Sequence, residues 1–300
     1  MNKKFVSIAA GLLSAGFLSA DGGFAVPPLS LHTRIAFDSE YVDRGTRLGQ
    51  QVFTPSIEVG ASILDKGELY FGNQNFLAIK SSELNKHDFY IGFTYDVTDL
   101  FTADLGFVAH IQKNLKDAFN KRALQLAREE ASNPNLTLEA LTTFFGGVPA
   151  TLAGVKKHSY EIYLGLAANV LLNPSFYYNY DFTWRRHNIE GKVNYLYDLS
   201  SFGVNGFAVD LSAKLGFDHT KRPWGIKKDV AQKELWSKDV KKGYFYYGAG
   251  ADLVYSFNEN AQARAGVKYE GQNKKKAWAY NAYASRKNLI WFSTSLDCGF

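Results

Sequence analysis

Apolar and polar residues alternate along most of the chain beyond Pro28. Between residues 101 and 111, for example, Phe101 and Leu105 belong to an apolar set at every second position, and Asp104 and His110 belong to the other set. A period of two is typical of β-strands whose two faces meet different surroundings. Twelve segments follow this pattern, at residues 31–41, 52–63, 67–77, 89–95, 101–111, 159–170, 175–184, 187–197, 207–218, 244–257, 261–270 and 288–300.

The connections between these segments alternate in length. Those after the even-numbered segments are brief, at residues 64–66, 96–100, 171–174, 198–206 and 258–260. Those after the odd-numbered segments are mostly long, at residues 42–51, 78–88, 112–158, 220–243 and 271–287, with only 185–186 short. Long loops at one end and short turns at the other are typical of bacterial outer-membrane barrels. The even strand count also places both chain ends on the short-turn, periplasmic side.

Strands that cross a bilayer must close into a barrel, because lipid offers no water to satisfy the polar groups of a free edge. The pattern therefore predicts an all-β, transmembrane antiparallel β-barrel of about 12 strands over residues 26–300. Its apolar set would face lipid and its polar set the lumen. Aromatic residues toward the strand ends would form interfacial girdles, namely Tyr41, Trp184, Phe217, Phe245 and Trp291 at one end and Tyr95, Phe101, Phe176, Tyr197, Tyr255 and Phe257 at the other.

A secreted, soluble β-sandwich or barrel would show the same alternation with its apolar set pointing inward. The two ends of the chain favour the membrane barrel. Residues 1–25 read as a signal peptide, with Lys3 and Lys4 before an apolar stretch and cleavage after Ala20 or Ala25. The last strand ends on Phe300, which resembles the signal that the outer-membrane insertion machinery recognises. We therefore expect the protein in the bacterial outer membrane.

Composition removes several other classes. Apolar residues at 46% and aromatic residues at 15% exclude a disordered chain. The single cysteine and six scattered histidines offer no metal-ligand cluster, so neither a metal nor a cofactor is expected. The net charge is +5, but basic residues gather in two of the long loops, where an anionic lipopolysaccharide leaflet is a better partner than nucleic acid. The residues concerned are Lys227, Lys228, Lys241, Lys242, Lys274, Lys275 and Lys276.

The polar set predicts the lining of the lumen. Acids outnumber bases in it, which favours cations or neutral solutes over anions. Glycines at inward positions, Gly106, Gly165, Gly216, Gly248 and Gly250, are expected to leave space. The alternative is that the charged groups pair and seal the lumen. The predicted pore-lining residues are Glu40, Glu58, Glu68, Asp104, Glu161, Asp181, Lys192, Asp210, Lys214, Asp252, Arg264 and Glu270.

The loop at residues 112–158 has a pattern of its own. Helical spacing at 115–130 and 136–145, separated by Asn133-Pro134, predicts two helices on the extracellular side. Folded inward, the loop would constrict a pore, and folded outward it would be a lid or a partner site. A surface loop without function is equally compatible with the pattern.

A family resemblance is carried by three short motifs near the N-terminus. They are Ser39-Glu40-Tyr41-Val42-Asp43-Arg44-Gly45, Pro55-Ser56-Ile57-Glu58 and Gly67-Glu68-Leu69-Tyr70-Phe71-Gly72. Over residues 35–110 the chain resembles the TorF-family porins, although Glu58 replaces a glutamine and Gln74 a tryptophan. The resemblance implies an outer-membrane porin in which Arg44 lies at the lumen mouth, tied to Glu58. The simpler interpretation is that Arg44-Gly45 forms a tight turn.

The sequence thus predicts a channel for passive diffusion of small hydrophilic solutes. A closed structural or adhesion barrel acting through its extracellular loops is the first alternative, and an outer-membrane hydrolase the second. A hydrolase needs a nucleophile beside a histidine, yet Gly-x-Ser-x-Gly is absent. The neighbours His158-Ser159 and Asp218-His219 would point to opposite faces of their strands, so no enzyme is expected.

Overall fold

The computed structural model describes residues 27–63, 65–79, 85–113, 158–220, 243–273 and 288–300. The predicted signal peptide, the helices of the 112–158 loop and the seven loop lysines lie outside these residues. The described residues form twelve strands: β1 Leu29–Asp43, β2 Thr46–Ser62, β3 Gly67–Ala78, β4 Asn85–Thr98, β5 Phe101–Lys113, β6 His158–Ala168, β7 Ser175–Asp181, β8 Arg186–Asp198, β9 Phe207–Thr220, β10 Gly243–Asn258, β11 Ala261–Gln272 and β12 Asn288–Gly299.

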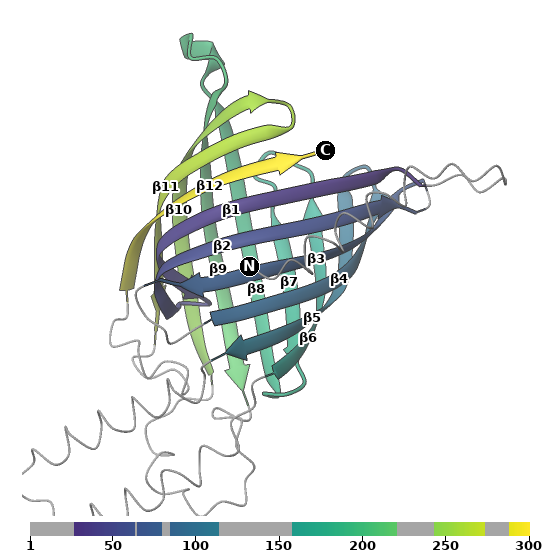
Figure 1. Ribbon diagram of the computed structural model, residues 1–300, viewed down its shortest axis with the longest axis vertical. Coiled ribbons are helices and arrows are strands. Elements are labelled where there is room, and N and C mark those ends of the chain that lie inside the picture. Colours follow the sequence, from purple (N-terminus) through teal and green to yellow (C-terminus); the bar gives the residue numbers. More distant parts are fainter. Residues whose placement is uncertain (1–26, 64, 80–84, 114–157, 221–242, 274–287) are drawn as a thin grey trace, which may run out of the picture.

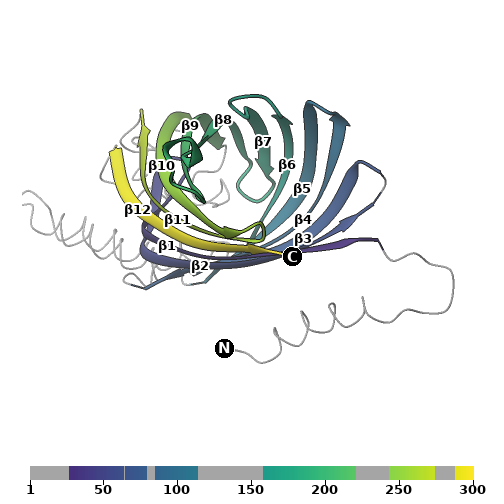
Figure 2. The same cartoon turned by 90° about the horizontal axis from the view of Figure 1, so that it is seen from above.

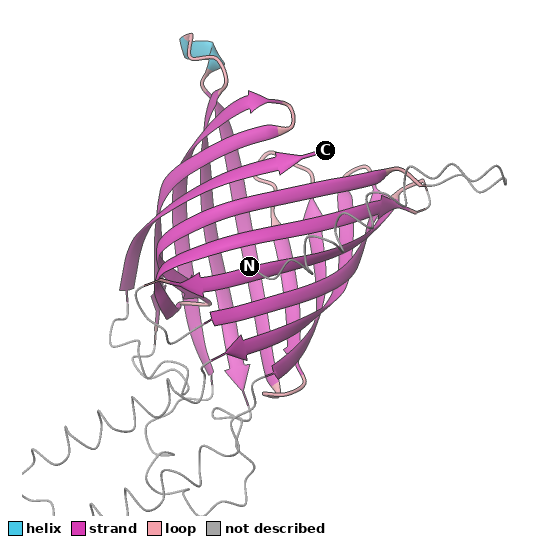
Figure 3. Cartoon of the chain, viewed as in Figure 1, coloured by secondary structure: helices cyan, strands magenta, loops and turns pink. Residues whose placement is uncertain are grey.

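The strands close into one antiparallel barrel (Figures 1 and 2). Each strand pairs with the next in sequence, and β1 completes the ring by pairing with β12, where Ile35 lies opposite Leu296. The only other element in the described part is a single turn of 3₁₀-helix, η1 Ser200–Phe202 (Figure 3). In that same part, no helix has the length and apolar character needed to cross a membrane. The predicted twelve-stranded barrel is confirmed.

The outer face of the barrel is apolar. Along β6 exposed and less exposed residues alternate, and the apolar side chains are the exposed ones. Leu164 on β6 and its partner Leu105 on β5 keep 55% and 50% of their surface. A soluble barrel would bury these side chains, whereas a lipid-facing band leaves them on the outside. An even-stranded closed barrel with such a band has the architecture of bacterial outer-membrane proteins, as the sequence predicted.

One connection, the end of β7 and two girdle residues differ from the prediction. The link at residues 42–51 is no long loop, because β1 and β2 extend to a two-residue turn, Arg44-Gly45. Asp181 closes the turn before β8 by accepting the backbone N–H groups of Thr183 and Trp184 at 2.7 and 2.8 Å. Trp184 and Trp291 are both buried and therefore do not belong to an interfacial girdle.

The inward glycines do not leave space, which corrects a second prediction. A Cβ atom on Gly106 would come within 2.2 Å of the Tyr163 hydroxyl, because the tyrosine ring lies over the glycine directly across from it on the next strand. Tyr177 covers Gly165 and Tyr246 covers Gly216 in the same way. Lysine and glutamate stems approach Gly248 and Gly250. These glycines let long side chains lie flat along the inner wall.

Candidate functional site in the barrel lumen

A cavity of about 380 Å³ lies against the inner faces of β1 and β8–β12. Seven predicted pore-lining residues contribute to it, namely Glu40, Lys192, Asp210, Lys214, Asp252, Arg264 and Glu270. Its walls also contain Arg34, Lys268, Asp38 and Glu190. Acids and bases are therefore nearly balanced here, so the excess of acids expected from the sequence is not found at this cavity.

Most of the bases in this cavity are matched with an acid on the wall itself. Arg264 Nη1 lies 2.7 Å from Asp210 Oδ2, and Lys214 forms an ion pair with Glu270. Each of these pairs joins β11 to β9, two strands away in the sheet. Further pairs are Lys268 with Asp252, Arg34 with Asp297, and Glu40 with Arg47. These ion pairs therefore lie along the barrel wall, and the cavity lies beside them.

Lys192 differs from the other cavity bases. It lies directly opposite Lys214 in the pairing of β8 with β9. Among the described residues no carboxylate lies within ion-pair distance of its ammonium group. Like charges opposite one another are unfavourable, and Lys192 lacks the direct ion pair that the other bases of this cavity form.

The wall made by β2–β7 is of another kind. Apart from Glu161 and Asp181 at the mouth, its predicted lining residues are the carboxylates Glu58, Glu68 and Asp104. In the described part of the chain none of these three forms an ion pair. Asp104 instead accepts hydrogen bonds from the hydroxyls of Tyr70 at 2.6 Å and Tyr177 at 3.2 Å. The resulting surface combines tyrosine hydroxyls with negative charge that no cation balances.

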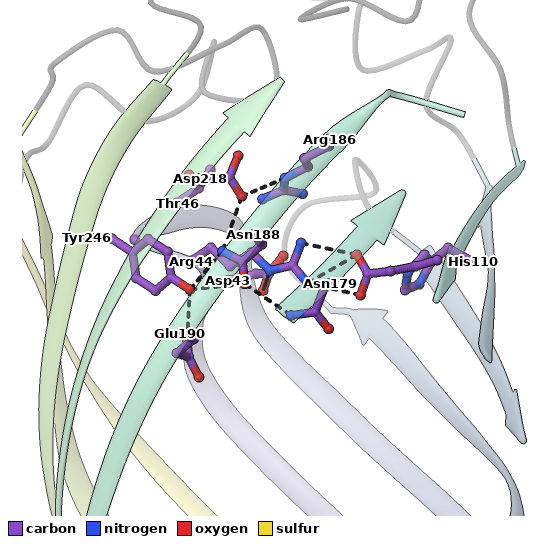
Figure 4. Close-up of polar contacts among 12 residues, drawn as sticks. Asp43, Arg44, Thr46, His110, Asn179, Arg186, Asn188, Glu190, Asp218 and Tyr246 are labelled. Atoms are coloured by element: carbon purple, nitrogen blue, oxygen red, sulfur yellow. Dashed lines mark hydrogen bonds and ion pairs between the residues drawn. The ribbon is translucent and has the colours of Figure 1, made fainter. Parts of the chain in front are cut away.

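The turn between β1 and β2 folds into the mouth of the barrel (Figure 4). The Arg44 guanidinium donates three hydrogen bonds of 3.0–3.2 Å to the two carboxylate oxygens of Glu161 on β6. The tie between Arg44 and Glu58 is therefore wrong, and the tight turn at Arg44-Gly45 is correct. Backbone φ angles of +52° and +74° at these two residues are those of a hairpin turn that favours glycine at its second position.

The same turn is held on the far side of the lumen. The Gly45 N–H donates to Glu270 Oε2 on β11 at 2.8 Å. The Tyr244 hydroxyl on β10 donates to the Arg44 carbonyl oxygen at 3.0 Å. A Cβ atom on Gly45 would lie 2.8 Å from the Cβ of Tyr246, so only glycine fits this approach. The turn thus joins β6 to β10 and β11 through the interior.

Further polar groups surround the turn. Arg186 Nε lies 2.7 Å from Asp218 Oδ2, and Asn188 donates to the Tyr246 hydroxyl at 2.9 Å (Figure 4). Arg186 and Arg44 line a cavity of about 80 Å³ together with Glu161 and Asp181, the two remaining predicted lining residues. The side chains of Glu161 and Asp218 are 8% and 0% exposed. Charge at the mouth is therefore paired and largely removed from water.

One arrangement at the mouth bears on the hydrolase alternative. His110 Nδ1 lies 2.8 Å from Asp88 Oδ1, and Ser159 lies opposite His110 on the next strand. A catalytic serine would be hydrogen-bonded to the histidine, but the Ser159 side chain is hydrogen-bonded to Asp181. Of the two histidines considered from the sequence, His158 is exposed and His219 stacks on Phe217. The described residues show no assembled nucleophile and base.

Comparison with known proteins adds little beyond the fold. No family model matches the chain, and no curated protein matches it. Among solved structures it is similar to the NanC porin, at 12% identity over 90% of this chain and 98% of that one, with a TM-score of 0.41. It is also similar to the KdgM porin (11%, 90% and 99%, 0.43) and to LpxR from Salmonella typhimurium (10%, 90% and 99%, 0.45).

Proposed function

We propose that the protein is a porin-like channel through which small hydrophilic solutes diffuse passively across the outer membrane. The observation that supports it best is the 380 Å³ cavity, which is lined by charged and hydroxyl groups inside a barrel with an apolar exterior. Polar groups in a lumen are stabilised by water, and a water-filled lumen admits small polar solutes.

The two walls bear on which solutes the channel would prefer. The β2–β7 wall presents Glu58, Glu68 and Asp104 without cations, whereas most charges on the facing wall are paired. Carboxylates that line a pore favour cations over anions. Tyrosine hydroxyls beside them offer hydrogen bonds to neutral hydroxylated solutes. We therefore propose that the channel prefers cationic and neutral solutes, with Lys192 opposing this preference locally.

Purified, folded barrels in a planar lipid bilayer test the channel directly. Stepwise increases in current are expected from the wild-type protein, because each inserted barrel adds one conducting path. A closed structural barrel that acts through its loops gives no steps. If protein that is folded by circular dichroism gives no current steps, passive diffusion is contradicted.

The preference for cations has its own test. The triple variant Glu58→Gln, Glu68→Gln, Asp104→Asn keeps the side-chain shapes and removes the three unpaired negative charges of the β2–β7 wall. We expect its reversal potential in a salt gradient to move toward zero. Glu259→Gln, in the exposed turn between β10 and β11, is the matched control and should leave the potential unchanged. An unchanged potential in the triple variant would remove these carboxylates from selectivity.

A further inference from the structure

We propose that the β1–β2 turn, residues 43–46, is a crossbar in the mouth of the barrel, and that Arg44 determines which solutes pass it by size and charge. This inference rests on the proposed channel function and identifies the part of the channel that determines which solutes pass. A hairpin of this kind ordinarily continues the barrel wall beyond the membrane. Here it turns inward, and its attachments show how firmly it is held.

The strands that lead to the turn are bent toward the lumen. The pairing of β1 with β2 shifts register between Tyr41 and Val42, as at a β-bulge, and Gln51 on β2 has a φ of +50°. A bulge bends its strand and re-aims the side chains that follow. Val42 is consequently buried in a small apolar cluster with Leu289 and Trp291 of β12. The crossbar therefore has an apolar anchor at its base.

The tip of the crossbar is anchored at both ends of its span. On one side Arg44 reaches Glu161 with bidentate geometry, which is the strong form of a charge-assisted hydrogen bond. On the other side Gly45 and the Arg44 carbonyl are bonded to Glu270 and Tyr244. The Thr46 hydroxyl lies 3.5 Å from the Tyr244 hydroxyl as a further contact. Attachments on opposite walls place the crossbar across the passage as a fixed obstacle.

The charges at the crossbar explain why Arg44 also selects by charge. Glu161, Asp43 and Asp181 line the same 80 Å³ cavity as Arg44, Arg186 and Lys86. Removal of one guanidinium leaves this narrow part of the passage more negative. Since the field at a constriction acts on every ion that passes, loss of Arg44 should favour cations as well as widen the passage.

The turn itself supplies a variant that should still fold. Asparagine followed by glycine is the sequence preferred in a two-residue hairpin turn with positive φ at both positions. Arg44→Asn therefore keeps the turn while removing the guanidinium from Glu161. The double variant Arg44→Asn, Glu161→Gln also avoids leaving a buried carboxylate without its partner. Lys66→Gln is the control, because Lys66 is an exposed base in the turn between β2 and β3 that pairs with Asp99 and lies outside both the cavity and the crossbar.

The experiment compares these barrels in planar bilayers, by single-channel conductance, by reversal potential and by the size of neutral polymer that enters the pore. Both Arg44 variants are expected to conduct about twofold more than wild type and to admit larger polymers. Only the single variant Arg44→Asn should favour cations more, because the double variant removes one charge of each sign. Lys66→Gln should leave the conductance, the size limit and the reversal potential unchanged. Circular dichroism and the mobility of unheated samples on gels establish that each barrel is folded.

The possible results separate the two proposals. If wild type conducts and the folded double variant has the same conductance and size limit, the crossbar proposal is wrong and the channel stands. If wild type is silent and the double variant conducts, passive diffusion through the native barrel is wrong, but the crossbar is supported as a plug. Silence from every folded barrel overturns both.

Discussion

Replacing Leu164 by arginine is expected to lower the free energy of unfolding of the barrel by about 2 to 4 kcal/mol. Leu164 lies near the middle of β6, on the outer face, and 55% of its surface is exposed. In the membrane this surface meets acyl chains, where a guanidinium loses its water and gains no partner. The size of the effect reports the depth of the position in the bilayer.

Reversible unfolding in guanidinium chloride, from barrels reconstituted in lipid vesicles, measures this difference. Leu171→Arg provides the matched control, because Leu171 lies in the turn between β6 and β7 and is 77% exposed. At that position the same exchange should cost at most about 1 kcal/mol, as at the edge of the bilayer. Equal costs at the two positions would mean that the band around Leu164 does not face lipid.

The architecture could be predicted from the sequence because one local pattern carries it. A period of two fixes which side chains share a face, and closure follows from the need to satisfy strand edges in lipid. Alternation alone therefore assigns Leu105 and Asp104 to opposite faces of the sheet, without any knowledge of which strands pair. What alternation does not determine is whether the apolar set faces in or out. The exposed outer side chains answer that question.

The connection after Tyr41 was wrongly predicted to be a long loop. The charged and glycine-rich stretch at residues 42–51 resembles a loop in composition, but most of it continues the strands into the lumen. The sequence did contain one indication of the turn, the glycine of Arg44-Gly45, because two-residue hairpin turns favour glycine at their second position. The inward bend follows a register shift between Tyr41 and Val42, and Val42 then packs against Leu289 and Trp291 of β12. Neither feature can be read from a local pattern.

The site was harder to predict than the fold, because its contacts join residues distant in sequence. Arg44 and Glu161 are 117 positions apart, and Gly45 and Glu270 are 225 apart. No periodicity specifies such pairs. Likewise, inward glycines predict space only if nothing lies across from them, and Tyr163 and Tyr246 fill that space from neighbouring strands. The sequence therefore predicts which residues face the lumen, whereas the residues that they contact there follow only from the closed barrel.

The second large effect is expected from Asp218→Ala, which should lower the free energy of unfolding by about 3 to 5 kcal/mol. The Asp218 side chain is 0% exposed, and it lies 2.7 Å from the Arg186 guanidinium, which is itself only 11% exposed. Removing the carboxylate takes the 2.7 Å ion-pair partner from a guanidinium that is largely out of water. Loss of one partner of a buried pair costs far more than the pair contributes as a whole.

Asp210→Ala is the comparison that separates burial from pairing. Asp210 and Arg264 have the same separation of 2.7 Å, but their side chains are 20% and 29% exposed beside the larger cavity. Once Asp210 is gone, lumenal water can solvate Arg264, whose Nε also keeps Asp297 Oδ2 at 3.9 Å. A loss of about 1 kcal/mol or less is therefore expected there. The double variant Asp218→Ala, Arg186→Met should recover much of the stability lost by Asp218→Ala. Equal losses at Asp218 and Asp210, measured by the same unfolding experiment, would show that water reaches both pairs alike and that the mouth around the crossbar is open.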